Sequence, residues 1–110
     1  MTGPDLTASD RYFHLKEAEE ATAALAVFAA DATVVDDGRT YLGHDEIREW
    51  LTGAASEFTT TSTRLSVEQD GDALDVLVRV EGNFPGGRVD LHHRFTTDAA
   101  GRVANLTIAP

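Results

Sequence analysis

A chain of 110 residues with ordinary apolar (42%) and charged (25%) fractions suits one globular domain, residues 1–110, around a single core. The absence of cysteine excludes disulfides and zinc–cysteine sites, and without a secretory pattern or an apolar run of membrane-spanning length we expect a cytoplasmic protein with no membrane partner. The net charge of −10, with its cationic residues scattered, argues against a nucleic-acid partner.

The first third of the chain has a helical pattern. No Gly or Pro interrupts residues 7–30, and alanine is frequent there. The letters TASD, 7–10, have the spacing of a capping box, with Thr7 as the cap and Asp10 three residues later. Apolar residues recur at three- and four-residue intervals on either side of the polar stretch KEAEEA. We predict two helices, about Thr7–Lys16 and Glu19–Phe28, that meet at a bend.

Two short extended pieces, TVVDD and RTYLG, then flank Gly38. A third helix is predicted from HDEIREWL, where Ile47, Trp50 and Leu51 have helical spacing. Gly53 is a plausible stop, and His44 or Asp45 is expected to cap the start of this helix.

The second half of the chain has a strand pattern. Four β-branched, alternating segments are separated by the turn signals DGD, PGG and DAAG. Helices followed by an antiparallel meander predict an α+β fold with the helices on one face of the sheet. In segment 88–96, alternation places Val89, Leu91, His93 and Phe95 on the core side and the charged residues on the other. The polar outer face, with Leu77 among charges, suits solvent or a homodimer through the sheet.

Four sequence stretches resemble the nuclear transport factor 2-like superfamily, in its SnoaL-like and ketosteroid-isomerase-like branch. They are RYF at 11–13, FAADATVVD at 28–36, YLGHDEIREWL at 41–51 and the closing strands. The resemblance implies a cone in which three N-terminal helices pack on a strongly bent antiparallel sheet, with an apolar pocket at one end. This superfamily hosts isomerases, dehydratases, cyclases, epoxide hydrolases and noncatalytic modules.

The abundance of Ala, Asp, Gly and Arg favours a bacterial source.

The same resemblance implies a set of site residues. Tyr12 stands where the isomerases have a tyrosine that binds the substrate oxygen, and Asp36 where they have the aspartate that moves the proton. Their third residue, an aspartic acid, is replaced here by Leu91, which cannot donate a hydrogen bond. His93, on the same predicted face as Leu91, would be compatible with the histidine of the superfamily's dehydratases, or it is a histidine satisfied by a neighbouring strand.

Asp36 and Asp37 are adjacent, so their roles need separating. Alternation directs Val34 and Asp36 into the pocket and Asp37 outward, although either carboxylate could simply cap the turn at Gly38. The expected pocket walls are Trp50, Phe58, Leu91, Phe95 and Val34. No metal-ligand or phosphate-loop motif is present, so we expect neither metal nor cofactor.

These observations favour a small cofactor-independent enzyme that acts on a hydrophobic, carbonyl-bearing small molecule. Asp36 would remove a proton next to the carbonyl, while Tyr12, with or without His93, would hold the oxygen. Isomerisation, dehydration and cyclisation share this enolate step. The alternative is a noncatalytic ligand-binding or dimerisation module in which Asp36 is structural.

Overall fold

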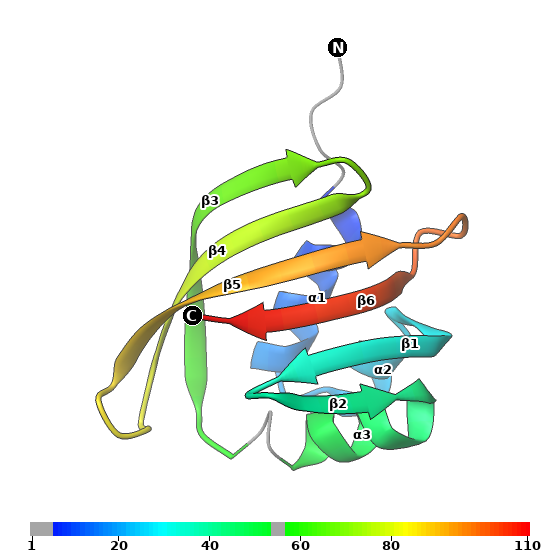
Figure 1. Cartoon of the computed structure of the whole chain (residues 1–110). Helices are drawn as coiled ribbons and strands as arrows, with labels where there is room; N and C mark the ends of the chain where they lie inside the picture. Colours follow the sequence, from blue (N-terminus) through cyan, green and yellow to red (C-terminus); the bar gives the residue numbers. More distant parts are fainter. Residues whose placement is uncertain (1–5, 54–56) are drawn as a thin grey trace.

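Helices and a single sheet form the two layers of the fold (Figure 1). The computed structural model describes residues 6–53 and 57–110. The elements in chain order are α1 (Thr7–Glu17), α2 (Ala21–Leu25), β1 (Phe28–Asp36), β2 (Arg39–Leu42), α3 (Gly43–Thr52), β3 (Thr60–Asp70), β4 (Ala73–Gly82), β5 (Arg88–Thr97) and β6 (Val103–Ala109). This order confirms the predicted α+β class, with its helices first and its meander afterwards.

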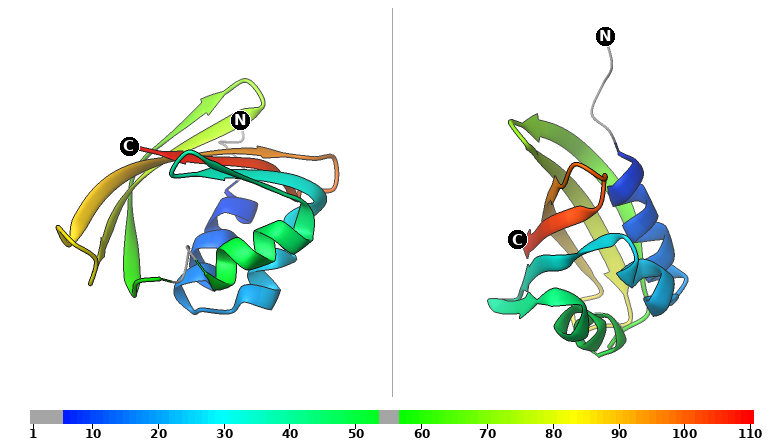
Figure 2. Two further views of the ribbon diagram at one scale, coloured as in Figure 1. Left: turned by 60° about the horizontal axis from the view of Figure 1, so that its bottom comes forward. Right: turned by 90° about the vertical axis from the view of Figure 1, so that its right-hand side faces the viewer.

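The sheet has the strand order β2-β1-β6-β5-β4-β3. Strands β3 to β6 form the expected antiparallel meander, whereas β1 and β6 run parallel, which the sequence did not indicate. The register shifts between Arg64 and Ser66 in β3 and between Thr96 and Thr97 in β5. Such irregularities increase the local bend of a strand. Figure 2 shows the resulting curved sheet with the helices packed beneath one face.

A two-residue turn fixes the end of β1. Asp37 and Gly38 both have positive φ, 52° and 74°, as a type I′ hairpin turn requires. Asp36 therefore pairs with Arg39, the first residue of β2. The Asp-Gly sequence thus sets the register that holds Asp36 at the last position of its strand.

The second helix is shorter than predicted, and Phe28 is in a strand. α2 ends at Leu25, and Phe28 begins β1 in register with Val103 of β6. The Val103 N–H also donates a hydrogen bond to the Val27 carbonyl. Strand pairing with the far end of the chain therefore overrides the helix propensity of the alanines.

The expected helix caps are also different. Leu6 is the N-cap of α1 and makes no side-chain cap, and Asp10 instead pairs with Arg64 at 3.0 Å. Neither His44 nor Asp45 caps α3, because that helix begins at Gly43 after Leu42. The Leu42 N–H donates to Glu46 Oε1 at 3.0 Å, and His44 Nε2 lies 2.9 Å from the Phe28 carbonyl oxygen.

The core lies between the helices and the inner face of the sheet. The alternation predicted for β5 is confirmed at His93 and Phe95, which are buried, whereas Val89, near the start of the strand, is exposed. Strand β4 alternates in the same way, with Val76 and Val78 buried. The largest fully buried side chains are Trp50, Tyr12, Phe28, Phe95, Ile47 and Leu106. Two of these aromatic residues, Tyr12 and Trp50, also line the site described below.

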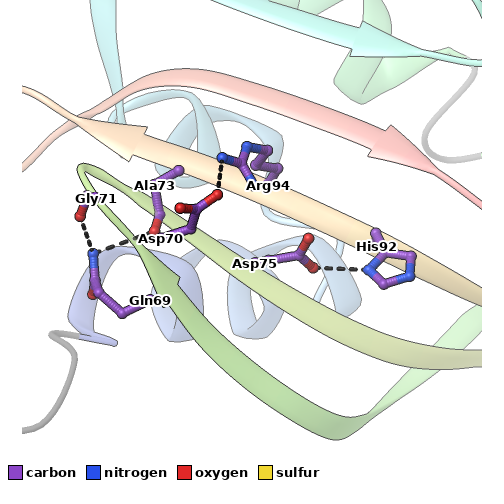
Figure 3. A network of polar contacts seen from close by, with 7 residues as sticks. All are labelled: Gln69, Asp70, Gly71, Ala73, Asp75, His92 and Arg94. Carbon is purple, nitrogen blue, oxygen red and sulfur yellow. Dashed lines mark hydrogen bonds and ion pairs between the residues drawn. The ribbon is translucent and has the colours of Figure 1, made fainter.

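The outer face of the sheet is polar, as expected. Figure 3 shows two of its cross-strand pairs, Asp75 with His92 at 2.9 Å and Asp70 with Arg94 at 2.9 Å. Exposed pairs of this kind contribute little to stability. No helix in the described part of the chain is long and apolar enough to cross a membrane.

Candidate active site

A cavity of about 620 Å³ opens between α1, α3 and the inner face of the sheet. Small-molecule sites usually measure about 300–1,000 Å³. Its lining combines aromatic and aliphatic side chains with a few polar ones: Tyr12, Phe13, Lys16, Asp36, Asp37, Trp50, Phe58, Thr60, Ser62, Val80, Phe84, Pro85, Val89, Leu91, His93 and Ile108. The helix face of Tyr12 and the inner face of β5 thus converge on the end of β1.

Most of the residues predicted to form a site line this one cavity. Asp36, Tyr12 and His93 come together here from a strand end, a helix and a second strand, and they are joined by Trp50, Phe58 and Leu91.

Two expected wall residues, Val34 and Phe95, are not among the residues that line this cavity. Val34 is fully buried at the centre of β1, between Tyr41 of β2 and Leu106 of β6. Phe95 lines a separate hollow beside the start of α1. Alternation identifies the inner face correctly, but it does not say how far along a strand the cavity extends.

The Asp36 carboxylate is held by a tryptophan. Trp50 Nε1 donates a hydrogen bond to Asp36 Oδ2 at 3.0 Å. In the described part of the chain no hydrogen bond reaches Oδ1, the other carboxylate oxygen. Asp36 therefore has one oxygen held by α3 and one oxygen without a hydrogen-bond partner among the described residues, in the wall of the cavity.

Asp37 also lines the cavity, contrary to the prediction from alternation. Its φ of 52° places it in the hairpin turn, where the two-residue period of a strand no longer applies. Unlike Asp36, Asp37 is exposed to solvent. The two carboxylates therefore share the cavity but differ in burial and in hydrogen bonding.

Tyr12 is completely buried among aromatic rings. It stacks parallel to Trp50 with ring centroids 6.2 Å apart, and Phe28 and Phe95 meet it edge-on at 5.9 Å. Its hydroxyl has no hydrogen-bond partner in the described residues. Burial, and to a smaller extent the charge of Asp36, raise the pKa of Tyr12, so the hydroxyl keeps its proton and can donate it in a hydrogen bond.

His93 is buried beside Tyr12 and packs edge-on against Phe13, with ring centroids 4.9 Å apart. Its Nδ1 has no hydrogen-bond partner among the described residues. Burial lowers the pKa of His93 to about 4, against a smaller opposing contribution from the Leu91 backbone. The ring is therefore neutral at physiological pH and offers one N–H donor and one acceptor nitrogen.

Lys16 is a cavity residue that the sequence prediction missed. It lies one helical turn after Tyr12, so the spacing of four residues could have placed both on one face of α1. Its Nζ donates a hydrogen bond to Thr60 Oγ1 at 3.4 Å. Burial lowers the pKa of Lys16, and the charges of Glu17 and Asp36 oppose this effect.

The arrangement can bind the oxygen atom of a ligand in a cavity with largely apolar walls. It presents a carboxylate that can accept a proton, and two uncharged groups, the Tyr12 hydroxyl and the His93 ring, that can donate hydrogen bonds. In residues 6–53 and 57–110, no three His, Asp or Glu side chains gather in a way that would hold a metal ion. The chemistry that these groups offer is proton transfer.

Comparison with solved structures gives the same fold throughout. A proposed polyketide cyclase from Sinorhizobium meliloti is 32% identical, with 94% of each chain covered and a TM-score of 0.86. The Δ5-3-ketosteroid isomerase from Mycobacterium sp. is 18% identical, with 99% of this chain and 94% of that chain covered and a TM-score of 0.82. Rv0760c from Mycobacterium tuberculosis, in complex with estradiol-17β-hemisuccinate, is 18% identical, with coverage of 99% and 95% and a TM-score of 0.81.

At 18% identity, the isomerase and Rv0760c show the shared fold alone. No match is found among curated proteins. The sequence profile of the SnoaL-like domain matches residues 10–106, which is nearly the whole chain. The match includes Tyr12, Asp36 and His93. The resemblance stated from the sequence is therefore confirmed: the chain belongs to the SnoaL-like family, within the superfamily that shares the ketosteroid isomerase-like fold.

Proposed function

We propose that this protein is a small cofactor-independent enzyme that removes a proton next to the carbonyl of a hydrophobic small molecule. One observation carries the proposal. A carboxylate with one free oxygen, Asp36, shares an aromatic cavity with two polar atoms that are buried without partners, Tyr12 Oη and His93 Nδ1, among the described residues. Buried polar groups without partners are costly and uncommon, so a ligand that satisfies them is a physical reason for their presence.

In this proposal Asp36 is the general base. The bond from Trp50 Nε1 to Oδ2 fixes the plane of the carboxylate, which leaves Oδ1 to take the proton. A base must lie within hydrogen-bond reach of the proton it removes, and a carboxylate fixed in the cavity wall meets that need for a ligand placed against it. Asp37, exposed in the turn, has no catalytic role.

Tyr12 and His93 stabilise the negative charge that develops on the carbonyl oxygen. Both are uncharged donors in a buried setting, where a hydrogen bond to an anion is stronger than in water. Loss of one such donor typically costs ~10²–10³ in rate. Because neither donor forms a hydrogen bond with a described residue through the atoms named above, both are available to the substrate.

The substrate class follows from the walls of the cavity. Its volume admits a ring system, and the side chains of Phe58, Phe84 and Leu91 give it a hydrophobic surface. The related structures carry names such as polyketide cyclase and ketosteroid isomerase, and one holds a steroid hemisuccinate. We infer a polyketide-like or steroid-like carbonyl compound. Isomerisation, dehydration and cyclisation all begin with the proton transfer proposed here.

A noncatalytic ligand-binding module is the second candidate. The observation that favours it is the Trp50–Asp36 hydrogen bond, which gives the carboxylate a structural partner. In this reading Asp36 anchors α3 to the end of β1, and the cavity only binds. The two candidates differ in one property: only the enzyme transfers a proton from its ligand.

We further propose a cytoplasmic homodimer that forms through the outer face of the sheet. This face places Leu77 among paired charges, Asp75 with His92 and Arg79 with Asp90. A two-fold axis through such a face would bring each charged pair against its own copy.

The test measures binding and proton transfer separately. Trp50 is the single tryptophan of the chain and lines the cavity, so its fluorescence reports ligand binding. A panel of hydrophobic cyclic ketones is titrated first, and the ketones that bind are incubated with the protein in D₂O and followed by NMR. Catalysed loss of the α-proton signal supports the enzyme. Tight binding without exchange across the panel contradicts it and leaves the binding module.

A further inference from the structure

Lys16 stands in the cavity without a role in the proton transfer proposed above. It is the only lysine in the sequence. α1 carries it one turn beyond Tyr12, so its side chain lies along the same wall, partly buried. A lysine whose only role is to interact with solvent would be expected on an exposed face of the helix, not in a cavity wall.

The amine of Lys16 has no carboxylate partner within ion-pair distance in the described part of the chain. Its hydrogen-bond partner is the uncharged hydroxyl of Thr60, at 3.4 Å. The two carboxylates whose charges act on Lys16 accept hydrogen bonds from other groups. Glu17 accepts one from the Ser62 N–H, and Asp36 accepts one from Trp50. Burial disfavours the ammonium form and lowers the pKa of Lys16, so the neutral amine is more accessible here than in an exposed lysine.

The neutral amine of a lysine is a nucleophile toward carbonyl carbon. We propose that Lys16 captures an aldehyde or ketone in this cavity as a Schiff base. The inference rests on the proposed function only in taking a carbonyl compound as the ligand.

The capture step needs no further reagent. The Nζ lone pair attacks the carbonyl carbon, forming a C–N bond while the C–O π electrons move to oxygen, and proton transfer from nitrogen to oxygen gives a carbinolamine. The nitrogen then loses its second proton, which leaves together with the hydroxyl group as one molecule of water. A C=N double bond to Lys16 remains.

The Schiff base would also assist the chemistry assigned to Asp36; on this route Tyr12 and His93 stabilise the alkoxide oxygen formed when Lys16 attacks, because that oxygen has left as water before the α-proton is removed. Once a solvent proton is on the imine nitrogen, the C=N bond attracts electrons more strongly than the original carbonyl. When Asp36 removes the α-proton, the C–H electron pair forms a C=C bond and the C=N π electrons return to nitrogen, giving an enamine. The charge of Asp36 is felt at Lys16, so the two groups act in one electrostatic environment.

Reductive trapping tests the capture directly. The folded protein is incubated at neutral pH with 2-naphthaldehyde and cyanoborohydride, which reduces a Schiff base to a stable secondary amine, and the modified residue is identified by peptide mass spectrometry. Arg48→Lys supplies a reference within the same molecule, because position 48 is exposed on α3 and outside the cavity. We expect Lys16 to be modified ~10-fold faster than the lysine introduced by Arg48→Lys.

A second measurement shows that the cavity is responsible. 2-Naphthylmethanol has the shape of the probe but no carbonyl, and it should slow the labelling of Lys16 and leave the introduced lysine unaffected. Labelling of Lys16 no faster than the reference, or labelling that the alcohol does not slow, would overturn the proposal.

Two variants separate this inference from the proposed function. Asp36→Asn should still be labelled at Lys16, because capture does not need the base. Lys16→Arg keeps a long basic side chain but cannot form the Schiff base, and its catalysed α-proton exchange should fall at least ~10-fold. Exchange that survives unchanged in Lys16→Arg would overturn the role of Lys16 and leave that of Asp36 intact.

Discussion

Lowering the pH from 7.5 to 5 is expected to destabilise the fold through His93. Burial lowers the pKa of His93 to about 4, while a histidine in the unfolded chain titrates near 6.5. As the pH falls below about 6.5, the histidine of the unfolded chain binds a proton, whereas His93 in the native state stays neutral. The free energy of unfolding therefore decreases. The loss begins near pH 6.5 and is complete below about pH 4.

The size of the effect follows from the same two values. At pH 5 the unfolded histidine is almost fully protonated, whereas His93 in the native state is still mostly neutral. The contribution of His93 to the unfolding free energy therefore falls by about 2 kcal/mol between pH 7.5 and pH 5. The charges of Lys16 and His92 add to the lowering of the pKa, and that of Asp75 opposes it.

Urea unfolding at the two pH values gives the measurement. Carboxylates also titrate in this range, so the relevant quantity is the difference between the wild type and His93→Phe, which keeps an aromatic ring against Phe13. The wild type should lose about 2 kcal/mol more than His93→Phe. His92→Gln, on the exposed face of the same strand, should keep the full loss. An equal loss in the wild type and His93→Phe would refute the burial argument.

Three further predictions concern stability, specificity and assembly. Tyr12→Phe removes a hydroxyl that has no partner among the described residues, so urea unfolding should show unchanged or slightly higher stability. Turnover of a bound ketone should fall ~10²–10³-fold. A clear loss of stability would mean that the hydroxyl forms a hydrogen bond in solution. Leu91→Asp places a carboxyl group in the cavity wall and should lower the free energy of unfolding by ~1–3 kcal/mol. It should create or increase the conjugating isomerisation of a 3-keto steroid, which is followed by ultraviolet absorbance. No gain in a folded variant would favour another orientation of the substrate. Light scattering should show a dimer that Leu77→Arg dissociates, and a monomeric wild type at micromolar concentration would contradict the proposed interface.

The strands could be predicted because their pattern is local. Alternation in β4 and β5 determined which side chains face the core, and the turn signals determined where each strand ends. The start of β1 could not be found in this way. Phe28 follows a run of alanines that favours helix, and only pairing with Val103, 75 residues later, makes it a strand.

The residues of the candidate site were likewise predictable only in part. Tyr12, Asp36 and His93 were identified by resemblance and by face, and they do line one cavity. Lys16 was missed because a single charged residue in a polar stretch looks like a solvated one, and only the position of β3 brings Thr60 within hydrogen-bond distance of it. The depth of a cavity along a strand depends on packing between distant elements, which alternation does not encode.

The central claim is that Asp36 accepts a proton from a bound carbonyl compound, and the most direct measurement compares two neighbouring variants. Asp36→Asn and Asp37→Asn are assayed for α-proton exchange of a cavity-binding ketone in D₂O. Asparagine tolerates the positive φ at position 37, so the turn should survive in that variant.

Exchange should be abolished in Asp36→Asn, with ketone binding retained by fluorescence, and it should be nearly unchanged in Asp37→Asn. Exchange that persists in Asp36→Asn, or that is lost equally in both variants, would contradict the assignment of Asp36 as the base.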